Sequence, residues 1–110
     1  MPAKTEPVPM RTAGTMRFPA GHPALPGHFP GRPLVPGVLL LDAALALIAA
    51  ANPGTAPAGL ARVKFLAPVG PDQDVAVRCG TSAVGRVQFA CLSDGVTVIE
   101  GTALLNASPL

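Results

Sequence analysis

The sequence contains no tryptophan and no tyrosine, and its only aromatic residues are four phenylalanines among 110 residues. Proteins that bind single-stranded nucleic acid use aromatic rings as platforms on which the bases stack. The formal net charge is only +2, so the chain also lacks the strongly basic surface that holds phosphate groups. The composition therefore argues against nucleic-acid binding, and we predict no nucleic-acid partner.

Cysteine and histidine are equally scarce, and the chain has only Cys79, Cys91, His22 and His28. These residues are too widely spaced to form a cluster of zinc ligands, and we predict no metal site. Both cysteines fall within segments that alternate between apolar and polar residues. We therefore interpret them as small buried thiols rather than as a disulfide, which agrees with a reducing cytoplasm.

Long apolar runs are absent as well, since no stretch reaches the roughly eighteen consecutive apolar residues that a membrane span requires. The N-terminal sequence, MPAKTEPVPMRTAG, has no apolar segment of the kind that a secretory signal peptide contains. We therefore predict a cytoplasmic protein with no membrane partner.

Charged residues make up only 13% of the chain, hydrophobic residues make up 49%, and the mean hydropathy is +0.45. A single domain of this length buries only about 60–70% of the surface that its unfolded chain exposes. Much of the remaining surface must then be apolar, which is typical of a subunit interface. The composition therefore predicts a homodimer or a higher even oligomer.

The apolar residues are most concentrated between Gly37 and Ala51, where Asp42 is the only residue after Gly37 that is not Val, Leu, Ile or Ala. Prolines at positions 33 and 36 hold the preceding chain extended, and Gly37 lets the backbone turn into a helix. A helix that is apolar on all sides is a buried helix. Because a buried carboxyl group must be paired, neutral or directed at a cavity, Asp42 is either a functional acid or a cap for a nearby loop amide.

Residues 15–110 are predicted to form a single domain, and the proline-rich residues 1–14 a disordered tail. The pattern of the remaining residues predicts strands over 15–18, 59–66, 75–80, 87–92 and 96–105. The pair Asp94-Gly95 is a strong signal for a two-residue hairpin turn. One buried helix followed by antiparallel strands is accommodated by a sheet that wraps around the helix, which is an α+β arrangement.

Residues 28–42, HFPGRPLVPGVLLLD, resemble the active-site signature of the β-hydroxyacyl-acyl carrier protein dehydratases of hotdog fold. That signature reads HFPG-x-P-x-x-PGV-L-x-x-(Glu or Asp), with the acid fourteen residues after the histidine, as Asp42 is after His28. A weaker similarity continues through Lys64-Phe65 and Pro68, and the short dehydratases of aryl-polyene gene clusters are the most similar in length. The resemblance implies the hotdog fold, in which an antiparallel sheet wraps around one long central helix.

The resemblance also implies a reaction, the removal of water from a 3-hydroxyacyl thioester to give a trans-2-enoyl thioester in fatty-acid or polyketide and aryl-polyene synthesis. In this family the histidine acts as the base and the acid protonates the leaving hydroxyl group, roles that fall to His28 of one subunit and Asp42 of the other. The amide of Gly37, with that of Val38, would bind the thioester carbonyl oxygen. The remaining signature positions that we expect to contact substrate are Phe29, Pro30, Gly31 and Pro36.

The resemblance implies no bound cofactor, because the substrate itself carries phosphopantetheine. Its carrier would be an acyl carrier protein or coenzyme A. Three basic residues are candidates for a rim that binds an acidic carrier protein: Arg32, Arg62 and Lys64. The alternative is that each is an ordinary solvated charge.

Two positions depart from the usual pattern of the family. Aspartate stands where glutamate is more common, and Ala46 stands where a glutamine often follows the acid by four residues. Two other functions therefore stay open, a hotdog acyl thioesterase and a non-catalytic hotdog subunit of a heterodimer. His28 argues against the thioesterase, which usually lacks this histidine. The presence of both His28 and Asp42 argues against the non-catalytic subunit.

Overall fold

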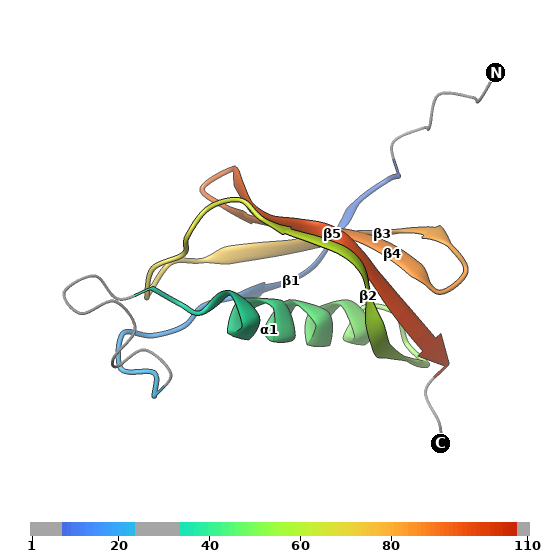
Figure 1. Cartoon of the computed structure of the whole chain (residues 1–110), viewed down its shortest axis with the longest axis horizontal. Helices are drawn as coiled ribbons and strands as arrows, with labels where there is room; N and C mark the ends of the chain where they lie inside the picture. Colours follow the sequence, from blue (N-terminus) through green and yellow to red (C-terminus); the bar gives the residue numbers. More distant parts are fainter. Residues whose placement is uncertain (1–7, 24–33, 108–110) are drawn as a thin grey trace.

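The computed structural model describes residues 8–23 and 34–107 (Figure 1). In these ranges the elements follow in the order β1 (Arg11–Met16), α1 (Gly37–Ala50), β2 (Thr55–Phe65), β3 (Val75–Ala83), β4 (Arg86–Ser93) and β5 (Val96–Ala107). The strands form one antiparallel sheet with the order β1-β3-β4-β5-β2.

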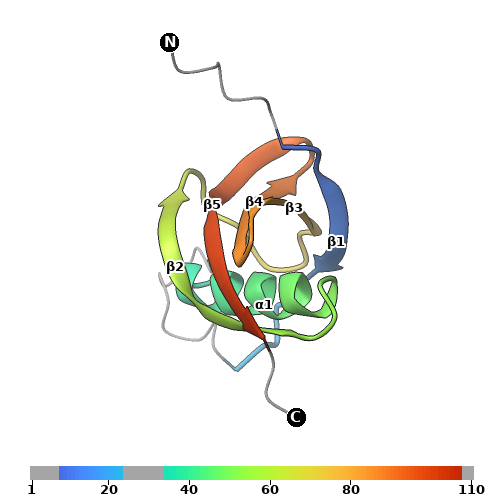
Figure 2. The ribbon, with the colours of Figure 1, turned by 90° about the vertical axis from the view of Figure 1, so that its right-hand side faces the viewer.

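The sheet is strongly curved, and α1 lies inside the curve (Figure 2). The edge strands β1 and β2 flank the helix on its two sides, while β3, β4 and β5 pass over it. This arrangement confirms the predicted α+β class and the predicted antiparallel sheet around one helix.

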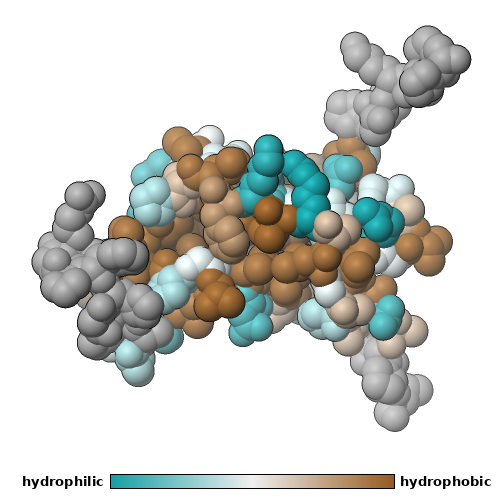
Figure 3. Space-filling view, viewed as in Figure 1, coloured by the Kyte–Doolittle hydropathy of each residue, from teal (hydrophilic) through white to brown (hydrophobic). Residues whose placement is uncertain are grey.

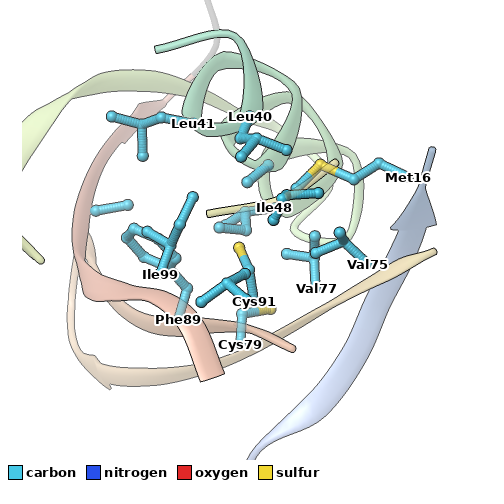
Figure 4. Close-up of a cluster of buried hydrophobic side chains, with 14 of the residues drawn as sticks. Met16, Leu40, Leu41, Ile48, Val75, Val77, Cys79, Phe89, Cys91 and Ile99 are labelled. Atoms are coloured by element: carbon cyan, nitrogen blue, oxygen red, sulfur yellow. The ribbon is translucent and has the colours of Figure 1, made fainter. Parts of the chain in front are cut away.

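The core forms where one face of α1 meets the concave face of the sheet (Figure 4). The helix contributes four buried side chains, Leu40, Leu41, Ala44 and Ile48. The central strands contribute alternate residues, as the pleat of a strand requires: Val75, Val77 and Cys79, then Val87, Phe89 and Cys91, then Ile99, Ala103 and Leu105. Removing this apolar surface from water is the main free-energy term that holds the two layers together.

Side chains from outside the helix satisfy the carbonyl groups at its C-terminal end. The Arg11 guanidinium donates to the Ala51 carbonyl at 2.6 Å, although the two residues are 40 positions apart. The Asn52 side-chain amide donates to the Ile48 carbonyl at 2.8 Å. These bonds complement the negative end of the helix dipole and attach β1 to the end of α1.

Strand β1 begins earlier than the sequence analysis predicted. Residues 11–14, which we assigned to the disordered tail, are paired with β3, whereas the predicted strand began at Thr15. The register of this pairing shifts between Thr12 and Gly14, and a Cβ atom at Gly14 would lie only 2.8 Å from Leu47 Cδ2. Pairing with β3 and close packing against the helix thus define this strand, and neither leaves a local pattern in the sequence.

Strand β2 also begins earlier, at Thr55 rather than at residue 59. It contains Pro57, which cannot donate a hydrogen bond to a sheet, and its register shifts between Pro57 and Gly59 and again between Leu60 and Arg62. Because β2 is an edge strand, a proline and register shifts are tolerated there. The predicted strand, 59–66, omits residues 55–58, where the proline and the first of these shifts interrupt the alternation of apolar and polar residues.

The prediction that α1 is buried on all sides is wrong for the single chain. Exposed residues recur at every fourth position, which places Val38, Asp42, Ala46 and Ala50 on one line along the helix. We call these four residues the open stripe. Val38 is 74% exposed, and three of the four residues are apolar. The sheet therefore covers only one side of the helix.

Both cysteines lie in the core with free thiols, on neighbouring strands β3 and β4 (Figure 4). This confirms their interpretation as small buried residues. Burial raises the pKa of the Cys91 thiol from its ordinary value of 9.0 to about 11. The native fold thus holds this proton more tightly than the unfolded chain does.

This difference in pKa predicts a pH dependence of stability. The unfolded thiol ionises first, so the unfolding free energy should fall as the pH rises from about 9 to about 11, by up to roughly 1.4 kcal/mol per pH unit. Urea unfolding at several pH values should show this fall in the wild type, and Cys91→Val, which keeps an apolar side chain without the thiol, should show a smaller one. Identical pH profiles for the two proteins would contradict the prediction.

Candidate active site

Part of the predicted site lies outside the described residues, namely His28, Phe29, Pro30, Gly31 and Arg32. The candidates that the structure does describe are Pro36, Gly37, Val38, Asp42, Arg62 and Lys64. The first three form the start of α1, and Asp42 follows in the next turn.

The start of α1 leaves backbone N–H groups available. The Pro36 carbonyl accepts the first helical hydrogen bonds, from the Leu39 N–H at 3.0 Å and the Leu40 N–H at 3.2 Å. Within the described ranges no side chain caps this end, and the first turn contains no acidic residue. The N–H groups of Gly37 and Val38 precede the hydrogen-bonded part of the helix, and the helix dipole gives this end a partial positive charge. Such an end favours a ligand atom that develops negative charge.

Val35 fixes the chain that leads into α1. Its side chain is buried, and its N–H donates to the Val69 carbonyl at 2.8 Å. Val69 belongs to the loop between β2 and β3, residues 66–74, and this loop is in turn bonded to β5. The N–H groups of Leu66 and Ala67 both donate to the Val98 carbonyl, at 2.8 and 3.3 Å. The start of the helix is therefore attached to the sheet through the 66–74 loop.

A buried hydroxyl group fixes the other end of this loop. Ser93 is 3% exposed, and its Oγ donates to the Asp74 carbonyl at 2.9 Å while it accepts from the Gln73 side-chain amide at 2.6 Å. The Gln73 side-chain oxygen accepts from the Gly70 N–H at 3.0 Å. The sequence analysis did not identify this network, because a serine at the end of a strand gives no sign of a partner that is 20 residues away.

A cavity of about 420 Å³ opens between the start of α1 and the 66–74 loop. It is lined by residues 34–37, Leu40 and residues 65–69, all of which are apolar. Figure 3 shows hydrophobic surface over α1 and the adjoining part of the sheet. An apolar cavity with backbone N–H groups at its rim suits a ligand that has an apolar body and one polar atom.

Asp42 lies on the open stripe and not in this cavity. It is exposed in the single chain, and it is absent from the residues that line the cavity. The sequence analysis expected a buried carboxyl group because it took the helix to be covered on all sides. The structure removes that premise, although the neighbours of Asp42 on the same face, Val38, Leu45 and Ala46, are apolar as expected.

The predicted basic rim is partly neutralised. Arg62 forms an ion pair with Glu100, with 3.5 Å between Arg62 Nη2 and Glu100 Oε1, and both side chains are well exposed. Lys64 is exposed on the same strand and stands directly across from Glu100 in the sheet register. The described part of the rim therefore combines two basic residues with one acidic residue.

Three further observations bear on the sequence analysis. His22 packs its ring against Phe18, with 5.4 Å between the ring centroids. Its backbone N–H donates to the Pro19 carbonyl at 2.9 Å, so His22 has a loop-packing role. Within residues 8–23 and 34–107, no group of three His, Cys, Asp or Glu side chains could hold a metal ion. In the same ranges no helix is both long enough and apolar enough to cross a membrane.

Comparisons with known proteins identify relatives of this chain. The family model of the ApeI-like dehydratases, described as ApeI dehydratase, matches residues 6–102. The chain is 30% identical to the 3-hydroxyacyl-[acyl-carrier-protein] dehydratase FabZ of Herpetosiphon aurantiacus over 105 aligned residues, which cover 84% of this chain and 74% of that protein. It is 34% identical to the FabZ of Cronobacter sakazakii over 94 aligned residues, which cover 76% of this chain but only 57% of that protein.

Solved structures agree on the fold. The dehydratase heterocomplex ApeI:P from Xenorhabdus doucetiae contains a chain that matches with a TM-score of 0.70 at 24% identity, covering 83% of this chain and 82% of that one. An uncharacterised protein from Erwinia carotovora subsp. atroseptica matches with a TM-score of 0.62 at 23% identity, covering 84% of this chain and 80% of that one. These similarities confirm the predicted hotdog fold.

The Ser93 network leads to a stability prediction. Ser93→Ala removes the buried hydroxyl group that accepts from the half-buried Gln73 amide and donates to the Asp74 carbonyl, so the unfolding free energy should fall by about 1–2 kcal/mol. The Gly70 amide, which depends on the position of Gln73, should also exchange its hydrogen faster in the native state. Ser82→Ala is the matched control, because Ser82 bonds only weakly to the Arg86 carbonyl, at 3.3 Å in an exposed hairpin. Equal stability losses in the two variants would contradict the role given to Ser93.

Proposed function

Because this chain belongs to the ApeI-like dehydratases, within the hotdog-fold acyl carrier protein dehydratases, we propose that it removes water from 3-hydroxyacyl thioesters bound to acyl carrier protein. The product is the trans-2-enoyl thioester, in fatty-acid or polyketide and aryl-polyene synthesis. The observation that supports this proposal best is the start of α1, which lies within the 28–42 signature, has no side-chain cap from the described residues and opens onto an apolar cavity.

The reaction breaks a C–H bond and a C–O bond and forms a C=C bond. His28 takes the α-proton as a base, since neutral imidazole is abundant near pH 7. The negative charge that develops on the thioester carbonyl oxygen is stabilised by the N–H groups of Gly37 and Val38. Asp42, in its protonated form, gives a proton to the β-hydroxyl group, which leaves as water. The apolar part of the acyl group lies in the cavity.

The acid role requires that Asp42 be covered. A carboxyl group must be protonated to act as an acid, and an apolar environment favours the protonated form. In the single chain Asp42 is exposed among apolar neighbours, so a second chain over the open stripe would supply that environment. The resemblance to the family implies that His28 of this second chain would act together with Asp42.

We infer that the second chain is another copy of this protein, bound at the open stripe and β2. Strand β2 is an eleven-residue edge of the sheet, and its exposed apolar side chains include Phe65, at 53%, and Leu60, at 36%. An edge strand with apolar side chains is a template for pairing with a second chain. The overall apolar composition and the relationship to the dehydratases favour the same conclusion.

A second candidate is a non-catalytic subunit that pairs with a different hotdog chain. Asp42 does not line the cavity. Ala46 also stands beside Asp42 where the family often has a glutamine. The similar structure from Xenorhabdus doucetiae is described as a heterocomplex. Mixing experiments separate the two candidates.

We predict that His28→Ala and Asp42→Asn each lower the dehydration rate by roughly a hundredfold or more, because each removes one partner in proton transfer. The double variant should be hardly slower than either single variant, since the two residues act in one step. The substrate is a 3-hydroxybutyryl thioester, followed by enoyl absorbance. Unfolding by urea serves as the folding control for each variant.

Mixing the two single variants tests the assembly. A homodimer whose sites combine His28 of one subunit with Asp42 of the other regains one intact site per mixed dimer, so part of the activity should return. A thioesterase would instead tolerate His28→Ala and lose release of free thiol with Asp42→Asn. If the wild-type homodimer neither dehydrates nor releases thiol, and becomes active only with a second hotdog chain, the non-catalytic candidate is correct.

For the carrier protein, we propose that Lys64 and Arg62 form the described part of the binding rim and that Glu100 weakens it. Glu100→Gln should therefore lower the KM for a substrate on acyl carrier protein, and Lys64→Glu should raise it, with both effects shrinking as salt increases. The same substrate on N-acetylcysteamine, which lacks a carrier, is the control and should be unaffected. Equal effects on both substrates would contradict this role for the rim.

A further inference from the structure

The ring of Phe65 occupies the place where a side chain at residue 37 would begin. A Cβ atom at Gly37 would lie 2.8 Å from Phe65 Cε1, which is closer than real Cβ contacts allow, and 3.1 Å from Cδ1, which is tighter than most. Phe65 is the last residue of β2, whereas Gly37 is the first residue of α1. The absence of a side chain at position 37 thus allows an aromatic ring from the edge strand to contact the start of the helix directly.

This contact is one of three described interactions that hold the start of α1 in place. The Val35 N–H bond to the Val69 carbonyl fixes the chain before the helix, and the Pro36 carbonyl fixes the first turn. No side-chain cap from the described residues restrains Gly37 itself. Phe65 is the group that packs against it, so the ring limits where the Gly37 and Val38 N–H groups can lie.

The exposure of Phe65 separates it from an ordinary core residue. Its side chain is 53% exposed, whereas the core phenylalanine, Phe89, is 2% exposed. Within the single chain this half-exposed ring contributes only part of the free energy that full burial would give, although the second copy that we propose at β2 would cover it further. Phe65 lines the cavity and lies against Gly37, whose amide is proposed to bind the substrate carbonyl oxygen. This position suggests a role in the site rather than in the core.

We propose that Phe65 is a positioning residue, which sets the place of the Gly37 and Val38 amides by its contact with Gly37. This inference rests on the proposed dehydration, in which these amides stabilise the charge on the carbonyl oxygen. A small misplacement of such donors lowers the rate of the chemical step much more than it weakens substrate binding, because the charge develops only in the transition state.

A pair of compensating substitutions tests the proposal, with dehydration of 3-hydroxybutyryl-coenzyme A as the assay. Phe65→Leu removes the ring atoms nearest to Gly37 and should lower kcat about tenfold with less than about a threefold change in KM. Gly37→Ala forces a Cβ atom against the ring and should lower kcat at least as much. In the double variant the alanine methyl group fills space that the shorter leucine vacates, so kcat should exceed that of Gly37→Ala.

The control is Val84→Ala, which shortens an exposed apolar side chain in the β3–β4 hairpin, near the opposite, C-terminal end of α1, and should keep the wild-type kcat. Thermal unfolding of every variant reports the structural effect separately. The proposal is overturned if Phe65→Leu lowers the melting temperature but leaves kcat unchanged, or if the effects of the two substitutions on kcat simply add. A wild-type protein that does not dehydrate the substrate would overturn the proposed function, and this inference with it.

Discussion

The hydrogen bond from the Val35 N–H to the Val69 carbonyl is the constraint on which the candidate site depends. Packing of Leu40, Leu41 and Ile48 holds the body of α1 against the sheet, but the segment directly before the helix, residues 34–36, belongs to no strand of that sheet. This bond joins it to the 66–74 loop, and the loop is joined to β5 and to Ser93. Both walls of the cavity are therefore fixed relative to the core.

The one-sided burial of α1 places a carboxyl group among apolar residues on the outer face of the helix. One face of the helix forms the core, and the opposite face consists of the open stripe with Asp42 among apolar residues. A helix of this composition gains no stability from water on its outer face, so covering that face with a second chain is favourable. The same covering would move Asp42 into an apolar environment, which connects assembly with the acid role that we propose.

The sequence was sufficient to predict the features that depend on local patterns. The helix was predicted from Gly37 to Ala51 and runs from Gly37 to Ala50, and the Asp94-Gly95 turn has positive φ at both residues, 51° and 77°. The early starts of β1 and β2 were not predicted, because Gly14 and Pro57 lie in irregular pairings that packing and the sheet edge decide. The signature also predicts the start of α1 as the candidate site, and this stays a prediction.

Features of the site that join distant segments could not be predicted in the same way. The resemblance named Gly37 for its amide, but only the structure shows that the ring of Phe65 fills the space beside it. Likewise, Arg62 and Lys64 were predicted as a basic rim, and Glu100, which lies 36 positions beyond Lys64 in the sequence, stands across from it in the sheet. A pattern within one segment carries no information on which residue a neighbouring strand places opposite.

The two ends of α1 differ in whether side chains bond to their free backbone groups. At the C-terminal end, Arg11 and Asn52 donate hydrogen bonds to the carbonyl groups of the last turn and just beyond it, so that end is closed by the chain's own side chains. At the N-terminal end the described residues contribute only an apolar ring and an apolar cavity, and no side chain competes for the Gly37 and Val38 amides. A serine or aspartate cap would stabilise such a helix by about 1 kcal/mol, and since none of the described residues supplies one, these amides stay available for the carbonyl oxygen that we propose they bind.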